Sequence, residues 1–69
     1  MPMRYYLLEE ETEEMGTCYG VVLQCGDETA AIPDITVSRQ SAVTLLEALI
    51  RGCVTPVTVR DVVDDWLNR

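Results

Sequence analysis

Apolar side chains recur at strand-like spacing in the first half of the chain and at helix-like spacing in the second. The segments Met3–Glu10 and Thr17–Gln24 are rich in aromatic and aliphatic residues, which is typical of strands. Thr29–Ile35 has the same character. The residues before it, Cys25 to Glu28, form a tight-turn signal with Gly26-Asp27 at its centre. The pattern therefore predicts three consecutive antiparallel strands.

The predicted turn also sets the pairing of the second and third strands. Residue 25 then faces 28, 23 faces 30, 21 faces 32 and 19 faces 34. One face carries the larger apolar side chains, and we assign it to the core: Tyr19, Val21, Leu23, Ala30 and Ile32. The other face carries Cys18, Gly20, Val22, Thr29, Ala31 and Ile35. Because a half-exposed antiparallel sheet normally alternates more cleanly, we expect something to cover this second face.

Two amphipathic helices are expected after the strands. Ser38 is placed to cap a helix over Arg39–Arg51, and Gly52 stands where the residue after a helix end belongs. Its apolar stripe comprises Ala42, Leu45, Leu46, Leu49 and Cys53. The second helix is expected in the last segment, from Thr55 to Arg69, where Thr58 with Asp61 resembles a capping box. Its stripe comprises Val59, Val62, Val63, Trp66 and Leu67, which we expect to pack onto the core with the aspartates facing solvent.

These elements predict an α+β fold in the order β-β-β-α-α, with a small three-stranded antiparallel sheet and two helices packed on one face. A chain of 69 residues has room for one domain, so we expect residues 1–69 to form a single compact domain. A core of this size is marginal unless another interaction supports it.

The charge of the chain restricts its partners. Twelve acidic residues against five arginines give a net charge of −7. Such a surface repels phosphates, so we expect no direct binding to nucleic acid and none to anionic membranes. The run Glu9–Glu14 is acidic except for Thr12. It lacks the alternating ligand positions of a calcium loop, so a solvated loop or strand end is the simpler interpretation.

The residue types present offer little for catalysis. Histidine and lysine are both absent, which removes the commonest general base and Schiff-base chemistry. Cys18, Cys25 and Cys53 are odd in number and form no CxxC pair, so we expect reduced cysteines that fill space in the core. We expect no enzyme activity, no cofactor and no metal. The apolar stretch near the amino terminus is too short for a signal peptide or membrane span, which favours the cytoplasm.

The two-sided apolar strands favour a small protein–protein interaction module, with self-association into a homodimer as one form of it. The expected contact residues are Tyr5, Tyr6, Leu8 and Val22. The sequence does not identify the partner. The alternative function is that of a polyanion mimic, whose acidic surface occupies a nucleic-acid-binding protein.

Four segments together resemble a family of short bacterial proteins of the Clostridia type, described only as a domain of unknown function. The segments are "MRYYLLEE" from Met3, "YGV" from Tyr19, "DIT" from Asp34 and "VTPVTVRDVVDDWL" from Val54. The resemblance covers nearly the whole chain in order. It implies one compact cytoplasmic domain and supplies no activity. A histidine expected after the last proline is replaced here by the Val57–Val59 segment, so no role built on it transfers.

Overall fold

A computed structural model describes residues 2–14 and 16–68 of the chain. Three strands are followed by two helices, which confirms the predicted order and the α+β class. The bounds are β1 (Met3–Thr12), β2 (Gly16–Cys25), β3 (Glu28–Thr36), α1 (Arg39–Arg51) and α2 (Val59–Leu67). Among these residues no helix is both long and apolar enough to cross a lipid bilayer.

The strands form one antiparallel sheet in the order β1-β2-β3, so β2 is central and the other two strands are edges. The predicted pairing holds where residue 25 faces 28, 23 faces 30 and 21 faces 32. The prediction that Tyr19 faces Asp34 is wrong, because Tyr19 pairs with Thr36 beyond a bulge. Asp34 lies inside this bulge with a φ of 62°, a left-handed conformation that breaks the alternation of β3.

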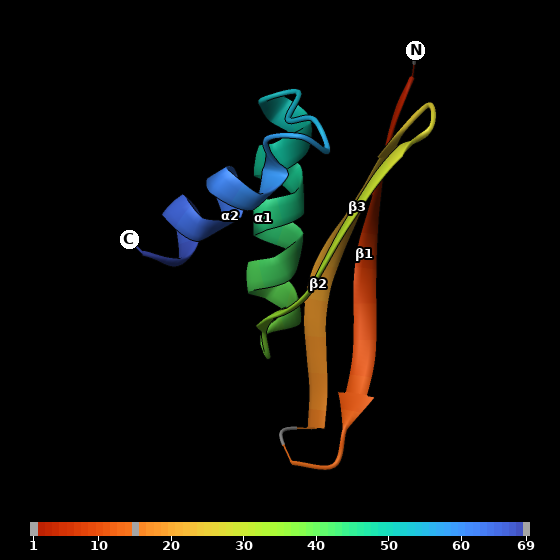
Figure 1. Ribbon diagram of the computed structural model, residues 1–69. Helices are drawn as coiled ribbons and strands as arrows, with labels where there is room; N and C mark the ends of the chain where they lie inside the picture. Colours follow the sequence, from red (N-terminus) through yellow and green to blue (C-terminus); the bar gives the residue numbers. More distant parts are fainter. Residues whose placement is uncertain (1, 15, 69) are drawn as a thin grey trace.

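Both helices cover the same face of the sheet (Figure 1). Helix α1 contacts all three strands, and α2 lies over β3. The β1–β2 hairpin extends past the amino-terminal end of α1, and the molecule has an elongated shape of 38 × 26 × 17 Å. Neither of these helices lies on the opposite face of the sheet.

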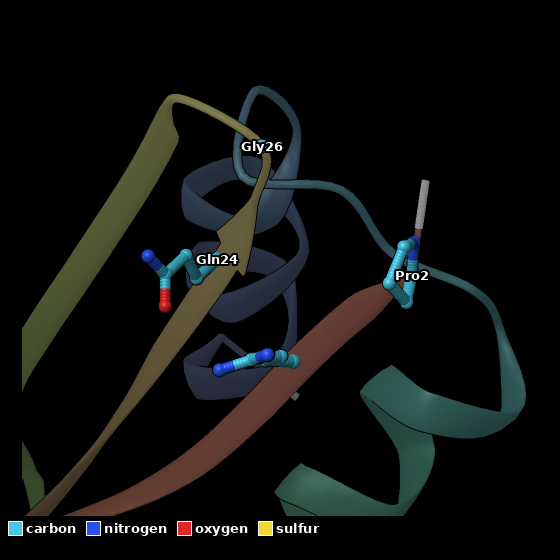
Figure 2. Close-up of a pocket in the computed structure, with 4 residues that line it drawn as sticks. Pro2, Gln24 and Gly26 are labelled. Carbon is cyan, nitrogen blue, oxygen red and sulfur yellow. The ribbon is translucent and has the colours of Figure 1, made fainter.

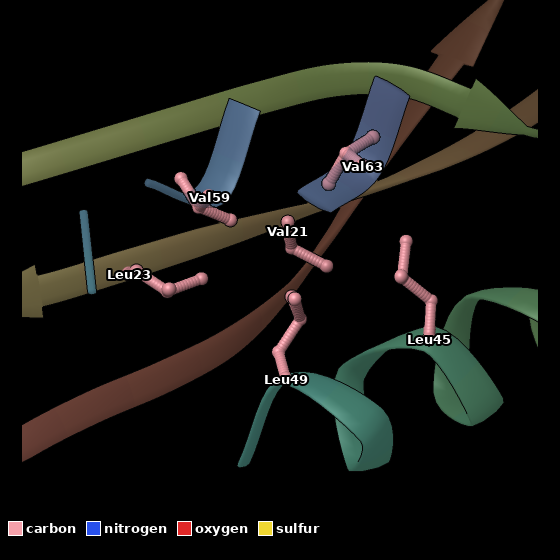
Figure 3. Close-up of a cluster of buried hydrophobic side chains, with 6 residues drawn as sticks. All are labelled: Val21, Leu23, Leu45, Leu49, Val59 and Val63. Atoms are coloured by element: carbon pink, nitrogen blue, oxygen red, sulfur yellow. The ribbon is translucent and has the colours of Figure 1, made fainter. Parts of the chain in front are cut away.

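The core lies between the sheet and the helices (Figure 3). Its fully buried side chains come from β2 and from both helices: Val21, Leu23, Leu45, Leu49, Val59 and Val63. Ile35 packs against this cluster, so its predicted position on the second face is wrong, and the bulge is the reason. Trp66 also packs against the cluster but keeps part of its surface exposed, and Leu67 is 51% exposed. The α2 stripe is therefore only partly covered.

The helix ends differ in how well the sequence predicted them. The Ser38 hydroxyl accepts a hydrogen bond from the Ser41 backbone N–H at 3.2 Å, which confirms the predicted cap of α1. The predicted capping box of α2 is not formed, since Thr58 makes no side-chain cap and its hydroxyl lies 3.1 Å from that of Thr55.

At the end of α1 the left-handed residue is Cys53, with a φ of 51°, rather than Gly52. The Cys53 N–H donates to the Ile50 carbonyl and the Val54 N–H donates to the Leu49 carbonyl, the pairing of a Schellman motif. Cys53 is exposed, so its predicted burial on the α1 stripe is wrong.

Candidate functional site

The face of the sheet away from the helices is the candidate site. Directly paired residues point to the same face, and alternate residues of a strand share a face. Val21 and Leu23 of β2 are fully buried against the helices. Their neighbours Gly20 and Val22 therefore belong to the opposite, uncovered face, which we call the open face.

Four apolar residues occupy the middle of the open face. Tyr6 of β1 pairs with Val22 of β2, and Val22 pairs with Ala31 of β3, so these three form one row across the sheet. In the next row Leu8 pairs with Gly20. Tyr6 is 45% exposed, Ala31 is exposed, and Leu8 and Val22 are half-buried. We call Tyr6, Leu8, Val22 and Ala31 the open-face patch.

The structure separates Tyr5 from the other three residues expected to make contacts. Tyr5 pairs with Leu23 and therefore points to the helix-covered face. Its hydroxyl donates a hydrogen bond of 3.2 Å to the Val54 carbonyl oxygen, which links β1 to the segment after α1. Burial raises the pKa of Tyr5 above its ordinary value. Tyr6, Leu8 and Val22 lie together on the open face, and their role in binding stays a prediction.

One end of the open face carries a positive charge. Arg4 pairs with Gln24, two residues before Tyr6 along β1, and it is the only basic residue of the three described strands. Arg4 and Gln24 line a hollow of about 300 Å³ together with Pro2 and Gly26. The hollow lies where β2 turns into β3 (Figure 2).

The other end of the open face is acidic. Glu10 pairs with Cys18 at this end. A second hollow, of about 400 Å³, is lined by Thr12, Glu13, Glu14 and Asp34. We call Glu10, Glu13, Glu14 and Asp34 the acidic end.

Cys18 is only 3% exposed although neither α1 nor α2 lies over it, and Asp34, Thr12 and Glu10 lie near its thiol. A hydrogen bond from its thiol to Asp34 raises the pKa of Cys18, and burial raises it further. The raised pKa keeps the thiol protonated at neutral pH, so it carries little of the thiolate form that acts as a nucleophile or a metal ligand. Across residues 2–14 and 16–68, no group of three or more His, Cys, Asp or Glu side chains is placed to hold a metal ion.

Sequence reasoning missed the charge polarity of the open face. Arg4, Tyr6, Leu8 and Glu10 alternate along β1, so a strand assignment already places all four on one face. The sequence therefore contained this information. However, β1 has apolar residues next to each other, such as Tyr5 and Tyr6, so the pattern did not show which of its two faces was open. Asp34 could not be assigned to the acidic end, because its position depends on the bulge.

A comparison with known protein families gives one match. A family model described as "Family of unknown function (DUF6514)" matches residues 1–69. No curated protein and no solved structure matches the chain.

Proposed function

The chain belongs to the DUF6514 family of unknown function, and we propose that it acts as a non-catalytic protein–protein interaction module. The proposed contact surface is the open-face patch. A single observation carries this proposal: apolar side chains of all three strands lie in adjacent rows on a face that the chain's own helices leave uncovered.

Burial of this patch is favourable because it removes apolar area from water. Tyr6 is well suited to the centre of such a contact, since it combines a large apolar ring with a polar hydroxyl. The flanking charges, with Arg4 at one end and carboxylates at the other, would form a polar rim that fixes orientation.

The absence of catalysis is part of the proposal. The chain has no histidine or lysine, and the raised pKa of the Cys18 thiol works against nucleophilic chemistry at neutral pH. We also propose a cytoplasmic location. Cys18, Cys25 and Cys53 are all unpaired, which fits a reducing compartment.

A photo-crosslinking experiment in the native host tests the proposed surface. A photoreactive phenylalanine analogue replaces Tyr6 in one strain and Ile50 of α1 in the control strain. The two side chains are 45% and 49% exposed, so they meet solvent to a similar extent, one on the open face of the sheet and the other on α1. We expect position 6 to give an adduct of defined mass and position 50 to give none. The adduct should disappear when Val22→Glu is added.

Two results would contradict the proposal. One is the absence of any adduct from position 6 over all growth phases. The other is the same set of adducts from both positions, which would indicate random collision. Circular dichroism of the Val22→Glu protein must match the wild type, because Val22 borders the buried strand core and its replacement must leave the fold intact.

A second candidate function rests on the acidic end. Glu10, Glu13, Glu14 and Asp34 lie close together on a protein of net charge −7, which is the feature a polyanion mimic needs. A mimic should lose its partner steeply as salt rises from about 50 to about 500 mM, whereas a partner held by the apolar patch should stay bound. Irradiation of cell extracts at the two salt concentrations separates these functions, because an adduct from position 6 that still forms at high salt would rule out the mimic.

A further inference from the structure

We infer that the partner of the open face is a second copy of this chain, packed face to face with its strands running in the inverted direction. The inference rests on the proposed function and adds the identity and orientation of the partner. It is carried by the polarity of the face, which places one basic residue, Arg4, at one end and the acidic end at the other.

Two orientations allow two identical sheets to stack with two-fold symmetry. If the axis runs along the strands, each end of one face meets the same end of its partner. Glu10 and Asp34 of one copy would then meet the same carboxylates of the other, and the two acidic ends would repel. If the axis runs across the strands, each end meets the opposite end. Arg4 of each copy then lies over Glu10 of its partner, giving two ion pairs.

The inverted orientation also brings apolar residues together. The row that contains Tyr6 and Val22 then lies over the partner row that contains Leu8 and Gly20. Gly20 is buried, because the Ile32 carbonyl and Pro33 of β3 occupy the space beside it. Tyr6 of each copy then lies over Leu8 of its partner, which buries apolar area from both sheets.

The size of the face predicts a weak, reversible dimer. Three strands spaced about 4.8 Å apart, over rows that rise about 3.4 Å per residue from Arg4 to Glu10, give a flat area of roughly 340 Å² per copy. The two copies together bury roughly 700 Å² of this flat area, which is below the about 1,000 Å² of a stable specific interface. We therefore expect association to appear between about 10 μM and about 1 mM.

Charge reversal at the two ends provides the test. Arg4→Glu places two carboxylates opposite each other at both ends of the inverted dimer, and Glu10→Arg places two arginines there. Each variant alone should dimerise about tenfold more weakly than the wild type, since two exposed ion pairs are lost. An equimolar mixture should restore dimers, because every Glu of one variant then meets an Arg of the other. Light scattering behind a sizing column and native mass spectrometry measure the dimer fraction of each variant and of the mixture.

Net charge alone cannot produce this result. Arg4→Glu changes the charge from −7 to −9, and Glu10→Arg changes it from −7 to −5. On charge alone the mixed pair would repel more than two Glu10→Arg chains do, so restoration in the mixture requires the specific pairing. Arg39→Glu in the first turn of α1 is the matched control, because it makes the same change of charge on the helical side.

Edge-to-edge pairing of two β1 strands is the main competing arrangement, because it too would place Arg4 near Glu10. Ala31 distinguishes them, since it lies on β3 at the far side of the sheet. Ala31→Arg should weaken face-to-face dimers strongly, and Ala48→Arg, at an exposed alanine of α1, should not.

The inference is wrong if the wild type stays monomeric at about 1 mM, if the mixture fails to restore dimers, or if Ala31→Arg leaves them intact. The photo-crosslinking result separates this failure from that of the proposed function. An adduct of twice the chain mass from position 6 supports the inference. An adduct with a different protein overturns the inference and keeps the proposed function.

Discussion

Replacement of Gly20 by alanine should strongly destabilise the fold, because β3 leaves no room for a side chain at this position. A Cβ at Gly20 would overlap the carbonyl oxygen of Ile32 and lie 2.8 Å from the Pro33 Cα. Both atoms belong to the backbone, so they cannot rotate away, and the bulge of β3 would have to move. Overpacking costs about 1–3 kcal/mol and occasionally more. The displaced segment pairs with fully buried Val21, so we expect a cost near the upper end of that range.

Thermal unfolding followed by circular dichroism and by the fluorescence of the single tryptophan measures this cost. A loss of about 3 kcal/mol should lower Tm by roughly 12–24 °C in a domain of this size. Gly52→Ala is the matched control, because Gly52 has an ordinary φ of −88° and a methyl group added there would meet the Ala48 carbonyl oxygen no closer than 3.4 Å. It should stabilise by about 0.4–1 kcal/mol. An unchanged Tm for Gly20→Ala would refute the reasoning.

Two further predictions concern single sites. Cys53→Gly should raise the free energy of unfolding by up to about 1 kcal/mol in urea titrations, since glycine relieves the left-handed strain at a φ of 51°; a loss of stability would show that the Cys53 side chain is needed. The free energy of unfolding should also fall as pH rises above about 9, because the pKa values of Cys18 and Tyr5 are raised in the folded state and the unfolded chain releases these protons first. The stabilisation that these two groups contribute is fully present at pH values below their ordinary pKa values. Cys18→Ala and Tyr5→Phe should each reduce the alkaline slope, and a slope equal to that of the wild type would contradict the assigned pKa shifts.

The strands and the turn were predictable because their signals are local. The Gly26-Asp27 turn set the pairing of β2 with β3 correctly as far as Val21 and Ile32. The bulge beyond that point was not predictable, because it accompanies a close approach between Gly20 and the β3 backbone, which involves residues distant in sequence. The same bulge moved Ile35 into the core.

The end of α1 shows a similar limit. Glycine is the usual residue for a left-handed helix end, so Gly52 was the natural assignment. The structure extends one residue further and places Cys53 there, because Val54 packs against the core and its N–H bonds to Leu49. Tertiary packing of Val54 thus decided a position that local preference had assigned differently.

One face of the sheet stays open because the described residues form too few helices and strands to cover both faces. A sheet has two faces, and both helices are required on one of them to bury Val21 and Leu23. Within residues 2–14 and 16–68 no further helix or strand remains to cover the second face, yet its central strand still carries Val22 there. A polar residue at that position would suit a monomer better, since half-exposed sheets favour polar outward positions. A domain of 69 residues has a small core, so its free energy of unfolding is small. We therefore propose that another chain completes the apolar open face, and the opposite charges at its two ends favour a second copy in inverted orientation as that chain.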